Sequence, residues 1–409
     1  MKVIHTSDWH IGRSLYGRKR YDEFEQFLDW MVEAIQDVRA DVLLIAGDIF
    51  DTTSPSNKAQ QLYYKFLCNV SNSCCRHIVV TAGNHDSPSF ISAPQELLHC
   101  LNVHVIGAAP ADPADCVLEL KDEHGDTELL VCAVPYLRDR DVRPVEAGES
   151  IDDKRLKLLS GIREYYAAAV KRAVDIQSGQ PGVVPIIGMG HLFTSGGKTV
   201  DGDGVRELYV GSLAHVEASS FPDAIDYLAM GHLHVPQVIG GSPCKRYSGS
   251  PIPMGFGEAG QAKSVVLITF DTRTPVVELI PVDTFLELRT LSGDWPALAE
   301  ALTACKAEGR PLWIEAEYTG DEIVTDLRER MTEHVDGAPI EILRIKNNRI
   351  LNRVLAQTNT DESLEDLDPK HVFERRLDSD NIAENDRKEL VTLYNLAVQS
   401  LHDTDEQAE

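Results

Sequence analysis

The sequence predicts an α/β fold in which helices cover sheets of buried, mostly parallel strands. Five short apolar runs each lead into a small residue and then a side chain that can bind metal. Continuous apolar runs of this length, bounded by glycine, are typical of strands buried on both faces. Amphipathic segments separate the runs, and strands that alternate with helices indicate a layered α/β domain.

The predicted elements follow in chain order. The strand runs are "KVIHTSD", "DVLLIAGD", "HIVVTAGN", "VVPIIGMGH" and "AIDYLAMGHLH". The clearest helix is predicted over residues 21–38, because apolar residues repeat there at helical spacing, namely Phe24, Phe27, Leu28, Met31 and Ile35. Further β patterns, "KRYSGSPIP" and "SVVLITF", close a first domain near residue 280.

Two smaller regions follow this domain. Residues 281–345 alternate short strand and helix patterns and predict a compact α+β capping domain. Residues 346–409 are predicted to be helical and to bind a partner. They carry an apolar stripe of Leu390, Leu393, Tyr394, Ala397 and Leu401. Because such a stripe has to be buried, it is expected to dock on a partner or on the chain's own capping domain.

The charge of the chain argues against binding of nucleic acid over the whole surface. The 409 residues carry a net charge of −26, and residues 361–409 alone hold 15 acidic and 5 basic side chains. Two stretches are locally positive despite the negative net charge and could contact a polyanion, namely "GRSLYGRKR" and "RIKNNRILNR". The N-terminus has no signal-like apolar core, so a cytoplasmic protein is expected.

The metal-capable side chains gather at predicted strand ends. In open α/β sheets, ligands bind beyond the carboxyl ends of the strands. Seven nitrogen and oxygen donors are too many for one tetrahedral ion and suit two adjacent divalent ions. Mixed imidazole and carboxylate donors favour Mn²⁺, Fe or Zn²⁺ over Mg²⁺ or Ca²⁺. The donors are Asp8, His10, Asp48, Asn84, His191, His232 and His234.

The motifs at these strand ends resemble those of a known superfamily. "SDWHIG", "GDIFD", "GNHD", "GHL" and "GHLH", in this order, are similar to the five blocks of the calcineurin-like metallophosphoesterases. The blocks "VRELYVGSL" and "RYSGSPIPMGFGE" resemble its SbcD branch, the nuclease subunits of bacterial SbcCD complexes. The resemblance implies a layered α-β-β-α nuclease domain, a capping domain and C-terminal helices.

The resemblance also implies roles for individual residues. One metal would be held by Asp8, His10, Asp48 and His234, and the second by Asp48, Asn84, His191 and His232. His85 would protonate the leaving oxygen, although it could instead be a structural histidine behind the ligands. Asp51 would orient His85, or it could cap the following helix. Arg18 and Arg20 could contact phosphates of DNA, or belong to an ordinary solvated loop.

The function implied is a Mn²⁺-dependent double-strand exonuclease and single-strand or hairpin endonuclease in DNA repair and recombination. It would act with an SbcC-like SMC-type ATPase, and ATP would be used only by that partner. Two copies of this chain would form a homodimer within a heterotetramer. The alternative is a small-substrate phosphodiesterase or phosphatase of the same superfamily. A helical stripe of Leu62, Tyr63, Phe66 and Leu67 is predicted to form the contact between the two copies.

Overall fold

The computed structural model describes residues 1–143, 148–199, 216–320, 324, 326–347 and 390. The predicted helices beyond residue 347, and the apolar stripe on them, lie outside the described residues apart from Leu390. The chain divides into two compact units. The first comprises Met1–Thr290, Thr303–Glu315 and Val335–Arg344, and the second comprises Leu291–Leu302, Ala316–His334 and Ile345–Glu409.

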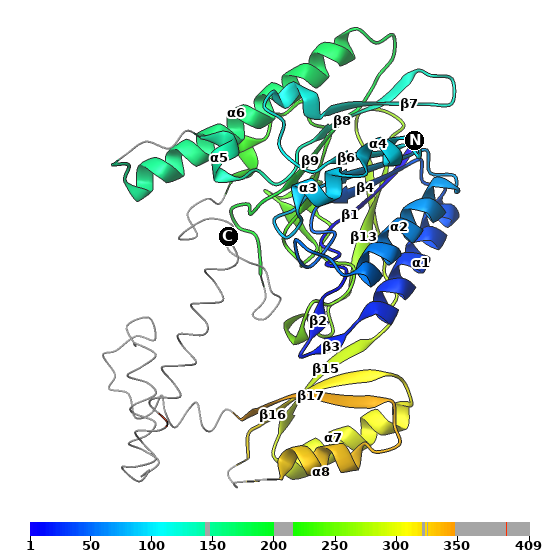
Figure 1. The fold of residues 1–409 in the computed structure, drawn as a ribbon, viewed down its shortest axis with the longest axis vertical. Coiled ribbons are helices and arrows are strands. Elements are labelled where there is room, and N and C mark those ends of the chain that lie inside the picture. The colour runs from blue at the N-terminus through cyan, green and yellow to red at the C-terminus, as the bar shows by residue number, and fades with distance from the viewer. Residues whose placement is uncertain (144–147, 200–215, 321–323, 325, 348–389, 391–409) are drawn as a thin grey trace. The chain divides into compact units, whose positions relative to one another are not determined.

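Two six-stranded sheets form the centre of the first unit (Figure 1). The first has the order β14 (Val276–Pro281), β13 (Ser264–Thr269), β1 (Lys2–Thr6), β4 (Val42–Ala46), β5 (His77–Thr81) and β6 (Val103–Ile106). The second has the order β11 (Gln237–Ile239), β12 (Ser242–Tyr247), β10 (Tyr227–Gly231), β9 (Ile186–His191), β8 (Thr127–Ala133) and β7 (Val117–Lys121).

Each sheet is largely parallel, with antiparallel strands at its edges. Strands β1, β4, β5 and β6 run parallel, β13 pairs antiparallel with β1, and β14 pairs antiparallel with β13. In the second sheet β8, β9, β10 and β12 are parallel, and β7 and β11 are antiparallel to their neighbours. The five predicted strands are thus central strands, and their carboxyl ends lie together at one edge of each sheet.

The sheets pack face to face, and helices cover both outer faces. Apolar side chains between the sheets form one core, which includes Val42, Leu44, Ile187 and Ala229. Helices α1 (Tyr21–Val38) and α2 (Asn57–Ser71) cover the first sheet, and α6 (Ile151–Ser178) covers the second (Figure 1). This is the layered α-β-β-α arrangement that the family resemblance implied.

Helix α1 has the bounds that its periodicity predicted, and all five of its predicted apolar residues are buried. The stripe on α2 is buried too, but against the chain itself. Leu62, Tyr63, Phe66 and Leu67 are each at most 2% exposed within the core beneath α1 and α2. The expectation that these four side chains form a contact between two copies is therefore wrong, because their own domain already covers them.

The remaining elements are short. A hairpin of β2 (Ser14–Leu15) and β3 (Arg18–Lys19) follows β1, and α3 (Pro88–Ser92), α4 (Gln95–His99) and α5 (Asp139–Val142) lie in connections. Residues 287–347 form β15 (Glu287–Gly293), α7 (Trp295–Glu308), β16 (Leu312–Tyr318), α8 (Leu327–His334) and β17 (Ile340–Asn347). The three strands form one sheet, which matches the alternation predicted for this region.

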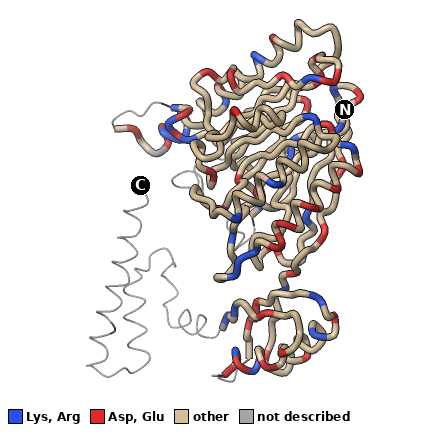
Figure 2. Tube along the Cα trace, turned by 45° about the vertical axis from the view of Figure 1, so that its right-hand side comes forward, with Lys and Arg blue, Asp and Glu red and all other residues tan. Residues whose placement is uncertain are grey.

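Charges are interspersed along the described chain, with lysine and arginine next to aspartate and glutamate (Figure 2). None of the helices in the described part is both long and apolar enough to cross a membrane.

Candidate metal centre

The seven predicted donors lie at the carboxyl ends of five strands. Six of them are at most 2% exposed, and Asn84 is partly exposed. Their donor atoms form two compact groups, which are Asp8 with His10 and His234, and Asp48 with His191 and His232. A third group of possible ligand atoms joins His10 with Asp51 and His85. Asn84 joins the second group, because its Oδ1 lies 3.0 Å from His191 Nε2.

Asp48 connects the two groups. Its Oδ2 lies 3.2 Å from His191 Nε2 in one group and 3.6 Å from His10 Nε2 in the other. Its Oδ1 accepts a hydrogen bond of 2.8 Å from the backbone N–H of His85. The carboxylate is therefore held in place between both sets of imidazoles, which is the geometry that a bridging ligand requires.

The imidazoles are oriented as metal ligands. His191 Nδ1 donates to the Ala46 carbonyl at 3.0 Å, which leaves the Nε2 lone pair facing Asp48. The Nδ1 atoms of His10 and His234 face carboxylates, Asp51 at 3.4 Å and Glu258 at 3.3 Å. Oxygens that face the non-ligating nitrogen in this way fix the tautomer of ligand histidines. The donor set therefore fits divalent metal.

Two further observations support this fit. The Nε2 atoms of His10 and His234 lie 3.2 Å apart. Two ligands about 2.0–2.1 Å from a common ion at a tetrahedral angle are separated by roughly this distance. His232 Nε2 is buried without a hydrogen-bond partner among the described residues. A buried imidazole nitrogen of this kind costs free energy unless something binds it.

The electrostatics favour the ligand form at Asp48 and His232 but not at His191. Burial alone would lower the pKa of His191, but the Asp48 carboxylate raises it to about 9. Burial alone would raise the pKa of Asp48, but the neighbouring His191 and His10 hold it well below the ordinary carboxyl value. Burial, together with the charge of His191, lowers the pKa of His232 well below the ordinary imidazole value. At neutral pH Asp48 is therefore an ionised carboxylate and His232 a neutral imidazole, which are the forms that bind metal, whereas His191 would release a proton when metal binds.

The backbone is strained where the donors are attached. Asp8, His10, Asp48 and His232 have φ angles of 54°, 49°, 51° and 105°. Non-glycine residues rarely adopt positive φ, and each costs about 1–3 kcal/mol unless the surroundings enforce it. Gly83 has a different reason to be glycine, because a Cβ there would collide with the Asp48 carboxylate. The strained backbone at the strand ends therefore lowers the stability of the fold, and it allows the donor atoms to approach one another closely.

Asp86, the last residue of "GNHD", holds two of the loops together. Its carboxylate accepts hydrogen bonds of 2.9–3.2 Å from three backbone N–H groups, those of Gly83, Ile49 and Phe50. Burial and the neighbouring Asp48 raise the pKa of Asp86 to about 7. No role was predicted for Asp86 from the sequence, and its place two residues after the donor Asn84 would have been the available signal.

A buried ion pair supports His234 from behind. Glu258 is fully buried, and its two oxygens divide between His234 Nδ1 and the Lys263 ammonium. Lys263 Nζ also donates to the His234 carbonyl at 3.1 Å. Burial alone would raise the pKa of Glu258, but contacts with His234 and Lys263 lower it to about 2. The charged carboxylate is therefore available to orient His234.

We expect Glu258→Gln to weaken metal binding by about 10–100-fold, the usual effect of losing a partner that orients a ligand. It should also destabilise the fold by about 3–5 kcal/mol, because Lys263 stays buried without the Glu258 charge. Metal affinity by calorimetry and unfolding in urea measure the two effects.

The double variant Glu258→Gln/Lys263→Met separates them. Removing both charges should restore most of the stability, since buried pairs can be replaced by apolar groups at little cost. Metal affinity should stay low. Recovery of metal affinity in the double variant would show that Glu258 acts on the fold and not on His234.

His85 lies beside this centre and is held by backbone. Its Nδ1 donates to the Asp51 carbonyl at 2.9 Å, and its ring lies edge-on to His10 with centroids 4.7 Å apart. The Asp51 carboxylate contacts His10 and the Arg13 guanidinium, 3.3 Å away. The expectation that the Asp51 side chain orients His85 is therefore wrong, because the backbone carbonyl of Asp51 holds the His85 ring instead. The alternative role as a helix cap is also wrong, because Ser56 caps α2.

Arg20 is not a surface residue. It is 2% exposed, its guanidinium donates to both oxygens of Glu23 at 2.7 and 2.9 Å, and it also donates to the Pro253 carbonyl. The expectation that Arg20 contacts DNA is therefore wrong, because the charge is buried and neutralised within the fold. Arg18 and Lys19, on β3, are exposed.

Comparison with known families agrees with this architecture. Residues 1–236 match the model of the calcineurin-like phosphoesterase family. Residues 284–381 match the model of the type 5 capsule protein repressor C-terminal domain.

Curated relatives are similar over most of their length. The chain is 34% identical to the SbcD subunit of the nuclease SbcCD of Escherichia coli K12 over 404 residues, which is 98% of each protein. It is 35% identical to the protein of the same name from Rhodobacter capsulatus, over 84% of this chain and 86% of the relative. The Bacillus subtilis protein of that name is 34% identical over 66% of each chain.

Proposed function

Since the chain belongs to the SbcD family of SbcCD nuclease subunits and is a metal-dependent phosphodiester hydrolase, we propose that it cleaves DNA with two Mn²⁺ ions. The proposed activities are exonuclease action on duplex ends and endonuclease action on single strands and hairpins. The observation that carries the proposal is the convergence of seven oriented donors at five strand ends, with Asp48 between the two groups.

The proposed ligands follow the two groups. Asp8, His10, Asp48 and His234 would hold one ion, and Asp48, Asn84, His191 and His232 the other. Divalent ions there would stabilise charge on the phosphate and lower the pKa of a water molecule. Neighbouring oxygens aim the imidazoles at the site, and His85 would donate a proton to the leaving oxygen.

We propose Arg18 and its neighbour Lys19 as contacts to the DNA backbone. Both are exposed on the hairpin that directly follows Asp8 and His10, and the Arg18 guanidinium also pairs with Glu341, which DNA would have to displace. Phosphate contacts of this kind position DNA without reading its sequence. With a net charge of −26, the chain depends on such local cations.

The proposed partners are an SbcC-like SMC-type ATPase and a second copy of this chain. ATP would act only through the ATPase, in DNA repair and recombination. Residues 346–409 are the proposed docking region for the ATPase. A homodimer would need a surface other than the buried stripe of α2, and light scattering at micromolar concentration tests for it.

Labelled DNA tests the function directly. Duplex, hairpin and single-stranded DNA are incubated with the protein, with and without Mn²⁺, beside bis(p-nitrophenyl) phosphate. We expect Mn²⁺-dependent cleavage of DNA. Hydrolysis of the small ester with no cleavage of any DNA would instead indicate a small-substrate phosphodiesterase.

Removal of the C-terminal region tests the docking proposal. Strand β17 continues to Asn347, so the chain is truncated after residue 347 and not at the predicted boundary of 345. We expect the shortened chain to fold and to cleave single-stranded DNA in Mn²⁺ at an unchanged rate. It should lose association with the ATPase and the ATP-dependent attack on duplex ends. Undiminished co-purification with the ATPase would contradict the proposal.

A further inference from the structure

Three histidines gather at the end of the first sheet that is opposite the metal centre. His77 begins β5, His99 ends α4, and His104 lies in β6. In the parallel pairing of β5 with β6, His104 is opposite Val79, two residues after His77. Residues two apart on a strand point to the same face, so His77 and His104 share one face of the sheet.

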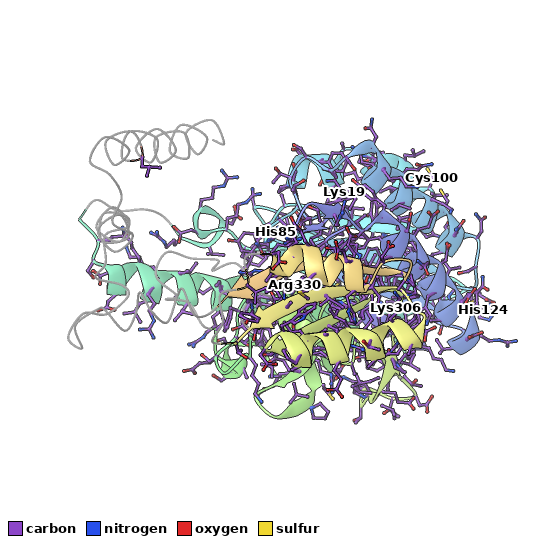
Figure 3. The ribbon with its side chains drawn as sticks, turned by 90° about the horizontal axis from the view of Figure 1, so that it is seen from below. Lys19, His85, Cys100, His124, Lys306 and Arg330 are labelled. Carbon is purple, nitrogen blue, oxygen red and sulfur yellow. The ribbon has the colours of Figure 1, made fainter. Side chains whose placement is uncertain are left out.

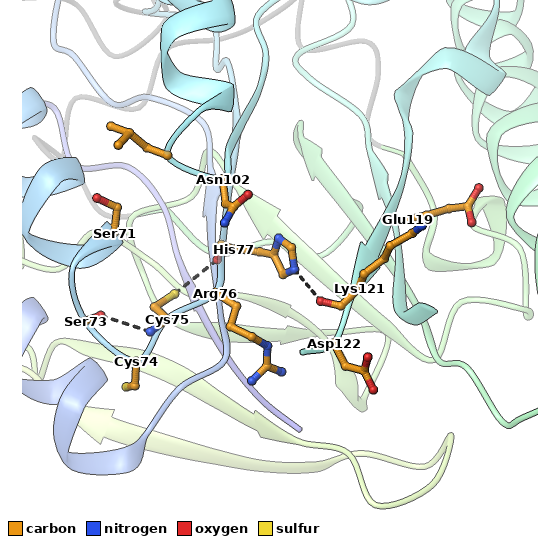
Figure 4. A pocket seen from close by; sticks show the side chains of 11 residues that line it. Ser71, Ser73, Cys74, Cys75, Arg76, His77, Asn102, Glu119, Lys121 and Asp122 are labelled. Carbon is orange, nitrogen blue, oxygen red and sulfur yellow. Dashed lines mark hydrogen bonds between the residues drawn. The ribbon is translucent and has the colours of Figure 1, made fainter. Parts of the chain in front are cut away.

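His77 is held in one tautomer by the second sheet. Its Nε2 lies 2.8 Å from the carbonyl oxygen of Lys121 on β7, a contact drawn in Figure 4. A carbonyl oxygen only accepts, so the hydrogen is on Nε2 and the Nδ1 lone pair faces His104 as an acceptor. A backbone carbonyl on the second nitrogen is the usual support for a ligand histidine.

The Nδ1 atom of His77 faces a second imidazole at a ligand-like separation. His104 Nε2 lies 3.4 Å from His77 Nδ1, long for a hydrogen bond between nitrogens. Two nitrogens bound to one tetrahedral ion at about 2.0–2.1 Å are separated by roughly 3.3–3.4 Å. Burial and the neighbouring His77 lower the pKa of His104 to about 4, so its ring is neutral at neutral pH.

The third histidine lies beside His104 and would complete the set by rotation of its side chain. The His99 ring lies edge-on to His104, with centroids 5.6 Å apart and an interplanar angle of 89°. His99 is exposed, and rotation of an exposed side chain about χ1 and χ2 is fast and costs little. His77 also lines an open pocket of about 510 Å³, together with Cys75, Asn102 and Lys121 (Figure 4).

We propose that His77, His99 and His104 bind one divalent transition-metal ion of the class that imidazole prefers, with Zn²⁺ as the probe. Imidazole donors without carboxylate or thiolate favour Zn²⁺, Cu²⁺ and Ni²⁺ over Mn²⁺ or Mg²⁺. The ion would tie β5, α4 and β6 together and, through Lys121, the second sheet.

This site is separate from the nuclease centre. His77 begins β5 and Asn84 follows its other end, and five residues of strand span about 17 Å. Figure 3 shows Cys100, the neighbour of His99, well away from His85. Loss of the cluster should therefore leave the nuclease reaction in Mn²⁺ unchanged.

Zinc stoichiometry tests the proposal. The full chain, His104→Gln and His124→Gln are dialysed against the same buffered free Zn²⁺, and bound zinc is measured by mass spectrometry. His124 is a matched control, because it is an exposed histidine in the turn between β7 and β8 (Figure 3). We expect His104→Gln to bind one ion fewer per chain than the other two. All three should cleave DNA equally in Mn²⁺.

Equal zinc in all three proteins would overturn the proposal. If His104→Gln does not fold, His99→Gln replaces it, since that side chain is exposed, and its affinity for the additional ion should fall at least tenfold. A crystal grown with Zn²⁺ should show anomalous scattering between His77 Nδ1 and His104 Nε2. Zinc bound only at the nuclease centre would contradict the assignment.

Discussion

Asp48→Ala should abolish metal binding and nuclease activity together. The Asp48 carboxylate lies within 3.6 Å of imidazoles from both donor groups. Its loss removes negative charge and a ligand shared by both proposed ions. We expect activity to fall by well over 100-fold, beyond the effect of losing a supporting residue.

The measurement is bound Mn²⁺ per chain, together with the rise in melting temperature that Mn²⁺ causes. A ligand at 100 times its Kd stabilises a protein by about 2.7 kcal/mol, so the intact chain should show a clear rise and Asp48→Ala none. His10→Ala should lose mainly one ion, and Asp37→Ala, an exposed carboxylate on α1, should lose neither. Two ions per chain in Asp48→Ala would contradict the bridging role.

Local sequence patterns were enough to predict the five strands and the metal-capable side chains at their ends. Helix α1 is the clearest example, since one apolar stripe determined its bounds and its buried face. The same reasoning failed for α2. Periodicity shows that Leu62 and Phe66 will be buried, but it does not distinguish the chain's own core from a partner.

Arg20 and Glu258 show where reasoning from local sequence ends. Arg20 stands in a basic loop, but Glu23 lies three residues later at the start of a helix, a spacing that pairs opposite charges. The spacing of Arg20 and Glu23 therefore indicated an ion pair, but the prediction of a DNA contact was based on the basic residues around Arg20. Glu258 pairs with a histidine 24 residues earlier, with strands β11 and β12 between them, so only the folded chain brings the two side chains together.

His85→Ala should separate binding from chemistry. His85 is held by a backbone carbonyl on Nδ1 and stands edge-on to His10 without belonging to either proposed ligand set. If it protonates the leaving oxygen, its loss should lower turnover on DNA by about 10²–10⁴-fold. Bound Mn²⁺ and the affinity for uncleaved DNA should stay at the level of the intact chain. Loss of an ion would instead identify His85 as a metal ligand.

The leaving group provides the sharper test of this role. A p-nitrophenolate leaves without a proton, so His85→Ala should lose far less activity on bis(p-nitrophenyl) phosphate than on DNA. Asp51→Asn is the matched control, because it keeps the carbonyl that holds His85 and changes only the carboxylate that faces His10 and Arg13. Its ratio of activities on the two substrates should equal that of the intact chain. An equal loss on both substrates in His85→Ala would mean that His85 positions the phosphate and does not donate the proton.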